Sequence, residues 1–165
     1  MNHKKNKPSR EEINSWIELK FNELQAGKIA EIAMLSGSMM PLLVPGKKIR
    51  VEPVNPIDIQ IGDIVVFKDR KGLTAHRVLL KLHVFHKQYF LQKGDANRYG
   101  SFIDEKHIRG RVIAVVINDT DYSDLKSDEK RKIAKRQAIV ELFKYIINIL
   151  LIFPRSIKHA LIRTK

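Results

Sequence analysis

Residues 61–82 read IGDIVVFKDRKGLTAHRVLLKL, and this stretch decides the fold class. It holds two short runs rich in Val, Ile, Leu and Phe, Asp63–Lys68 and Thr74–Leu82, separated by the turn signal Arg70-Lys71-Gly72. β-branched and aromatic residues bounded by turn residues are typical of strands. The stretch therefore predicts two consecutive strands.

The same texture extends over residues 28–118. Further short apolar runs are separated by turns that contain Gly, Pro, Asp and Asn; they are Lys48–Val54, Gln88–Lys93 and Gly110–Ile117. Several short strands with turn signals between them favour a compact barrel or sandwich. We expect a mainly β, barrel-like domain over residues 28–118, flanked by one helix on each side.

The first helix is expected within residues 1–27. Ser9 and Glu12 have the spacing of a capping box, and apolar residues then recur at helical intervals over Glu11–Gln25. Gly27 is a plausible end. The basic residues before Ser9 resemble the start of a secretory signal, but no apolar core follows them, so a cleaved signal peptide is not expected.

The second helix is expected within residues 119–165, a basic amphipathic extension entered through the polar segment Asp119–Asp128. The segment Gln137–Phe153 is strongly apolar, is interrupted by Glu141, Lys144 and Asn148, and ends before Pro154. A helix that spans a membrane needs about 20 mainly apolar residues. We therefore expect this helix on the β core or on a membrane surface, with an integral spanning segment as the alternative.

The chain is strongly basic, with a net charge of +13 over 165 residues. Such a charge attracts polyanions, so an anionic membrane surface is a candidate partner; no specific nucleic acid is expected. There is no cysteine, which excludes disulfides and thiol catalysis. No cofactor or metal site is expected either, since no carboxylate pattern accompanies His76, His83 and His86.

Three segments carry candidate chemistry. Residues 36–41 read SGSMMP, and their Ser38 becomes a nucleophile if a base accepts its proton. His76, in an apolar strand, titrates near neutrality and can serve as that base. Asp95, in the turn KGDAN at residues 93–97, can orient the imidazole. Each segment alone is also compatible with an ordinary turn or strand.

Together the segments resemble the type I signal peptidase family. Residues 36–41 look like its nucleophile box, Ile61–Phe67 resembles its Gly-Asp-hydrophobic strand, and Gly110–Val112 is similar to its closing strand. The pair His76-Arg77-Val78 and Lys93–Asn97 resembles the archaeal, sporulation and endoplasmic-reticulum branch, which uses a histidine base. The resemblance covers about residues 29–117.

The resemblance implies a serine endopeptidase in the fold shared with self-cleaving repressors. Ser38 would attack the scissile carbonyl, His76 would accept its proton, and Asp95 would orient His76. The Ser38 amide and the Ser36 hydroxyl would form the oxyanion hole, and Asp104 would match a second acidic position of the histidine branch. The substrate would be a leader or signal peptide with small residues before the cut.

The family usually carries an apolar anchor helix directly before the serine box, whereas this chain has the charged helix Glu11–Gln25 there. We therefore expect a cytoplasmic enzyme or one peripheral on the cytoplasmic membrane. Two other functions stay open: a self-cleaving regulator of the same fold, and a catalytically idle module that docks on membranes or polyanions. A lysine base, Lys81 or Lys93, is the alternative to His76.

Overall fold

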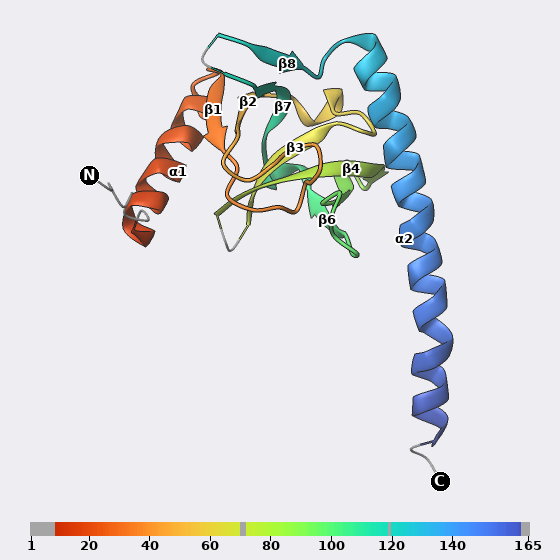
Figure 1. Ribbon diagram of the computed structural model, residues 1–165. Helices are drawn as coiled ribbons and strands as arrows, with labels where there is room; N and C mark the ends of the chain where they lie inside the picture. The colour runs from red at the N-terminus through yellow and green to blue at the C-terminus, as the bar shows by residue number, and fades with distance from the viewer. Residues whose placement is uncertain (1–8, 70–71, 119, 163–165) are drawn as a thin grey trace, which may run out of the picture.

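The computed structural model describes residues 9–69, 72–118 and 120–162, with the side chains of residues 10 and 152–162 excepted. The basic residues before Ser9 and the turn residues Arg70 and Lys71 lie outside this description. The described chain folds into one antiparallel sheet with a helix on either side (Figure 1). The expectation of a mainly β protein flanked by two helices is confirmed.

Each apolar run named above forms a strand, and three short strands outside those runs complete the sheet. The helices are α1 (Arg10–Gln25) and α2 (Asp128–Ile162). The strands are β1 (Ala30–Ala33), β2 (Lys48–Glu52), β3 (Ile64–Asp69), β4 (Gly72–Val84), β5 (Lys87–Lys93), β6 (Ser101–Asp104), β7 (Ile108–Val116) and β8 (Tyr122–Asp124). Short 3-10 turns at Pro56–Asp58 and Glu105–His107 precede β3 and β7.

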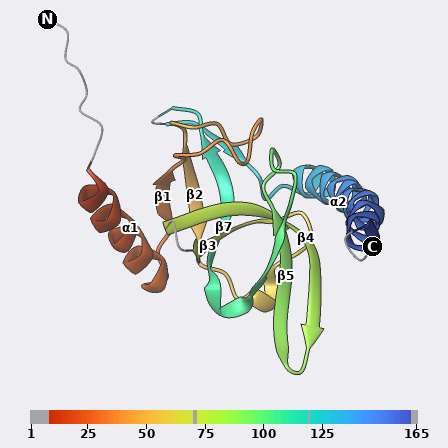
Figure 2. The same cartoon turned by 90° about the horizontal axis from the view of Figure 1, so that it is seen from below.

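The sheet is open, which corrects the expectation of a barrel-like closure. Its strand order is β1-β2-β7-β3-β4-β5-β6, with β8 paired to β7 beyond the end of β3. A barrel requires the first and last strands to pair. Here the two edge strands, β1 and β6, do not pair with each other. α1 contacts β1 at one edge, and β6, at the other edge, has only four residues. The long hairpin of β4 and β5 projects from the sheet (Figure 2).

β3 is the centre of the core because it is buried on both faces. Alternate residues of a strand point to opposite sides of a sheet. Ile64 and Val66 accordingly pack in one apolar cluster, whereas Val65 and Phe67 pack in another. The first cluster also takes in Leu24 of α1, which fixes that helix against the sheet.

α2 packs on the opposite side of the β domain from α1 and extends beyond it (Figure 1 and Figure 2). Ala138 is fully buried against Leu79 of β4 and Leu91 of β5, with Leu142 and Tyr145 packed beside it. The close approach depends on Gly62, where an added Cβ would lie 2.8 Å from the backbone of Ala134.

The region after residue 118 differs from expectation in two respects. The polar segment before α2 contains β8, which pairs with β7, so the sheet continues past the expected boundary. α2 also continues past Pro154 to Ile162, although proline cannot supply the hydrogen bond to the preceding turn. No helix in the described part of the chain is long and apolar enough to cross a membrane, contrary to the alternative expectation for Gln137–Phe153.

The substitution Gly62→Ala tests the docking of α2. Its Cβ would collide with the α2 backbone, so we expect a loss of about 2 kcal/mol or more in the free energy of unfolding, measured with urea. Gly46→Ala is the matched control, because Gly46 has a similar positive φ and no atom within 4 Å of an added Cβ. Equal losses for the two variants would show that α2 does not press on Gly62.

Candidate functional site

The structure brings Ser38 and His76 together from segments 38 residues apart in the sequence. Ser38 lies in the loop between β1 and β2, and His76 lies in β4. The Ser38 hydroxyl is 3.2 Å from His76 Nε2, within hydrogen-bonding distance. This is the contact that a serine nucleophile and its general base require.

The loop that carries Ser38 is anchored on both sides of the serine. Met39 and Leu43 are fully buried in the cluster that also holds Ile64 and Val66. The Met34 amide donates to the Lys47 carbonyl, and the Gly46 amide donates to the Met34 carbonyl, which closes the base of the loop. The apolar residues that follow Ser38 therefore hold the serine half-buried at a fixed place.

The turn after β5 holds the backbone of Ser38 from the other side. The Ala96 amide donates a hydrogen bond of 2.9 Å to the Ser38 carbonyl. Gly94 lies so close that an added Cβ would be 2.5 Å from that carbonyl oxygen. The glycine in the KGDAN segment is thus required by a close approach of two backbones.

Gln92 of β5 orients the imidazole of His76. Its side-chain oxygen forms a short hydrogen bond with His76 Nδ1, and its side-chain nitrogen donates to the Ser101 hydroxyl at 2.7 Å. A carboxamide oxygen can only accept, so Nδ1 carries the proton and Nε2 of the neutral ring is free to accept one from Ser38. Sequence reasoning missed Gln92; the signal was a glutamine directly after the apolar residues Phe90 and Leu91 of β5.

The environment of His76 favours the neutral imidazole. Burial lowers the pKa of His76 below its ordinary value, although the hydrogen bond with Gln92 and the nearby carboxylates of Asp69 and Asp95 act in the opposite direction. The Phe67 ring meets the imidazole edge to face, with centroids 5.8 Å apart. A histidine that stays neutral below its usual range is available as a base at neutral pH.

Asp95 does not hold the place at His76 that the sequence predicts for it. Its carboxylate accepts two hydrogen bonds from the Arg77 guanidinium, at 2.9 Å and 2.7 Å, and one from Gln137 of α2. The partner of His76 Nδ1 is Gln92 instead. The physical reason is the alternation of β4, which points His76 and Arg77 to opposite faces. Asp95 lies on the face of β4 to which Arg77 points, away from the imidazole of His76.

The other predicted site residues divide between the site and its surroundings. The Ser36 hydroxyl lies 3.3 Å from the Ser38 hydroxyl, next to the candidate nucleophile. Asp104 accepts from the Lys106 amide and from His107, and so caps the 3-10 turn before β7. Burial alone would raise the pKa of Asp104, but its hydrogen bonds with Lys106 and His107 outweigh burial and lower it.

Both candidate lysine bases have their ammonium groups bound away from Ser38. Lys81 donates to the carbonyls of Ile57 and Ile59, at 2.7 Å and 3.2 Å. Lys93 is buried and donates to the Glu141 carboxylate of α2 at 2.7 Å. The Ser38 hydroxyl lies within hydrogen-bonding distance of His76 Nε2 and of neither ammonium group, which favours the histidine base.

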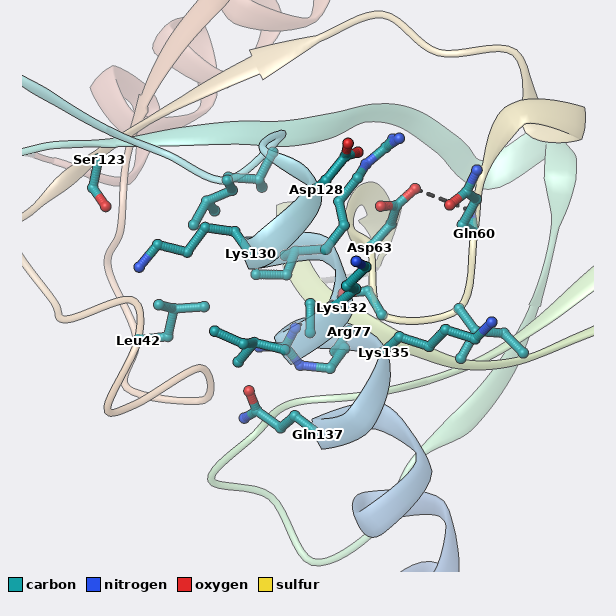
Figure 3. A pocket seen from close by; sticks show the side chains of 18 residues that line it. Leu42, Gln60, Asp63, Arg77, Ser123, Asp128, Lys130, Lys132, Lys135 and Gln137 are labelled. Carbon is teal, nitrogen blue, oxygen red and sulfur yellow. Dashed lines mark hydrogen bonds between the residues drawn. The ribbon is translucent and has the colours of Figure 1, made fainter.

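A cavity of about 360 Å³ lies between the first turns of α2 and the sheet (Figure 3). Arg77, Leu42 and Gln137 line it, and neither Ser38 nor His76 is among its lining residues. It therefore belongs to the Arg77 face of β4. Among the described residues, no group of three His, Asp or Glu side chains is placed to hold a metal ion.

Comparisons with protein-family models, curated proteins and solved structures find no match to this chain.

The titration of His76 tests the role of Gln92. We expect Gln92→Leu to lower the pKa of His76 further, because a hydrogen bond that favours the imidazolium is lost, and Gln92→Glu to raise it, because a carboxylate stabilises that form. Nuclear magnetic resonance of the imidazole protons against pH measures both shifts. Gln88→Leu, in the same strand, is the control. A larger shift from Asp95→Asn than from Gln92→Leu would restore Asp95 as the orienting residue.

Asp95→Asn is expected to destabilise the fold. The Arg77 and Asp95 side chains are only 1% and 4% exposed, so the variant leaves a buried guanidinium without its counter-ion. Loss of one partner of a buried pair costs about 3–5 kcal/mol. Urea unfolding measures this loss. The control Glu18→Gln breaks the exposed pair with Lys68 and is expected to cost less than about 1 kcal/mol. Similar values for both variants would contradict this role of Asp95.

Proposed function

We propose that the protein is a serine endopeptidase of the signal peptidase type, with Ser38 as nucleophile and His76 as general base. The observation that carries the proposal is the 3.2 Å contact between the Ser38 hydroxyl and His76 Nε2, on a ring whose other nitrogen is bound by Gln92. A nucleophile, a base within reach and a third group that orients the base are the parts that covalent acyl transfer requires.

In the first half of the reaction, Ser38 Oγ attacks the scissile carbonyl as His76 Nε2 accepts its proton. The tetrahedral intermediate collapses when the imidazolium gives that proton to the leaving amine, which breaks the peptide bond and leaves an ester on Ser38. Water then attacks the ester, with His76 again accepting and returning a proton. Gln92 keeps Nδ1 protonated throughout.

The oxyanion is assigned to donors near Ser38. The Ser36 hydroxyl, 3.3 Å from the Ser38 hydroxyl, would donate to the negative charge that develops there, together with the backbone amide of Ser38. This arrangement needs the Ser38 backbone to be rigid. The hydrogen bond from Ala96 to the Ser38 carbonyl and the buried Met39 supply that rigidity.

The substrate assigned to the site is a leader or signal peptide with small residues before the cut. The resemblance of residues 36–41 and 93–97 to the signal peptidase boxes is its basis. Leu35 and Met40, three residues before and two residues after Ser38 in the sequence, are exposed apolar side chains that suit a peptide with an apolar segment. We assign the enzyme to the cytoplasm or to the cytoplasmic face of the membrane.

Substitution of the nucleophile is the direct test of activity. With fluorogenic peptides that carry Ala before the scissile bond, we expect Ser38→Ala to lower kcat/KM by at least about 10⁴-fold. Ser36→Ala is expected to lower kcat by about 10²-fold, because one oxyanion donor is lost. Ser123→Ala, in β8, is the control. Cleavage that survives Ser38→Ala unchanged would reject the mechanism, and wild-type cleavage of added peptides in trans would separate the enzyme from an idle module.

The pH profile identifies the base. His76 must be neutral to accept the serine proton, so activity is expected to fall as the pH drops through the pKa of His76, which lies below the ordinary histidine value. Measurement of kcat/KM between pH 4 and 10 gives the midpoint of this acid limb. A midpoint on the alkaline side of neutrality would assign the reaction to a lysine instead.

A further inference from the structure

The outer face of α2 is apolar and has no partner in the described structure. Its inner face packs Ala138, Leu142 and Tyr145 on β4 and β5. Residues at intervals of three or four lie on one side of a helix. The remaining stripe is formed by large exposed side chains, namely Ile139, Val140, Phe143, Ile146, Ile147, Leu150 and Leu151.

The stripe is exposed to an unusual degree for a surface that faces water. Phe143 and Leu150 are each 63% exposed, and Ile147 is 53% exposed. Single exposed apolar residues need no explanation, but a contiguous run along one helix face indicates a surface that binds something apolar. Figure 1 shows that the later part of α2 extends beyond the β domain, so the sheet does not cover the end of the stripe.

Charge identifies the chemistry of the partner. The helix carries a cluster of basic residues immediately before the stripe: Lys130, Arg131, Lys132, Lys135 and Arg136. Lys132 and Arg136 are exposed, and their spacing places them on the same side of the helix as Ile139 and Phe143. A stripe that is basic at one end and apolar along the rest matches a surface with anionic headgroups above an apolar layer.

We propose that α2 docks the protein on an anionic lipid bilayer, with residues 139–151 buried at the boundary between headgroups and acyl chains. Lys132 and Arg136 contact the lipid phosphates. A second copy of this chain is a poorer occupant, because the net charge of +13 opposes the close approach of two such helices. The proposal does not depend on the catalytic activity of Ser38.

The same helix would place the β domain rigidly at the lipid surface. Ala138 packs on the sheet directly before Ile139 and within about two turns of Phe143. Glu141 is bound to the buried Lys93, next to the turn that holds Ser38. Burial alone would raise the pKa of Glu141, but its hydrogen bonds with Lys144 and Lys93 outweigh burial and lower it, so the Glu141 carboxylate stays ionised at neutral pH. The part of α2 that would contact the bilayer is therefore connected to the Ser38 site through Ala138, Glu141 and Lys93.

Sedimentation of the full chain with lipid vesicles tests the proposal. We expect binding to vesicles of phosphatidylglycerol and phosphatidylcholine, weakened by salt, and much weaker binding to phosphatidylcholine alone. The triple variant Phe143→Ser, Ile147→Ser and Leu150→Ser is expected to bind at least about 100-fold more weakly. The double variant Lys132→Ala and Arg136→Ala is expected to lose about 30-fold on the anionic vesicles.

The matched control removes three exposed apolar residues elsewhere. Leu82, Val84 and Phe85 lie on the β4–β5 hairpin, where Phe85 is 91% exposed, and their replacement by Ser is expected to leave vesicle binding unchanged. Circular dichroism and thermal unfolding verify that each variant folds. Equal binding by the α2 triple variant and the wild type would overturn the proposal. So would self-association of the lipid-free wild type that the triple variant abolishes, without vesicle binding, since the stripe would then bind a second copy.

Discussion

The buried ion pair between Arg77 and Asp95 is the interaction on which the candidate site depends. The guanidinium binds both carboxylate oxygens and also donates to the Gly62 carbonyl, while Gln137 of α2 donates to the same carboxylate. Four parts of the chain meet there: β4, the turn before β3, the turn after β5, and α2. The net stability of such a pair is small, but the cost of breaking it is large, so it fixes one arrangement of these parts.

One backbone hydrogen bond connects this ion pair to the candidate nucleophile. Asp95 stands in the turn whose Ala96 amide holds the Ser38 carbonyl. On the other face of β4, His76 meets the Ser38 hydroxyl and Gln92. Two adjacent residues of β4 thus have different roles. Arg77 binds Asp95 and so holds the turn after β5, whereas His76 is the candidate base. A neutral amide in the third position selects the tautomer of His76 but stabilises its protonated form less than a carboxylate would.

The sequence predicted the strands well because their signals are local. Ile64–Phe67 is β-branched and apolar between turns, and it forms the buried strand that such a run predicts. The proximity of Ser38 and His76 was also predictable, from the resemblance of their segments to the signal peptidase boxes, and the structure places the Ser38 hydroxyl 3.2 Å from His76 Nε2. The role of Asp95 was not predictable, because the sequence does not show on which face of β4 the turn after β5 lies. In the structure that turn lies on the face of Arg77. Closure of the sheet and the pairing of β8 depend on contacts between distant strands, which no local pattern reveals.

The central claim is that Ser38 is a nucleophile activated by His76. Its most direct test is reaction of the intact protein with a fluorophosphonate, followed by mass spectrometry of the modified peptide. We expect a single adduct on Ser38 that is lost in His76→Ala, while Gln88→Leu still reacts. Failure to react under conditions where the protein is folded, or an adduct on a different serine with Ser38 unmodified, would contradict it.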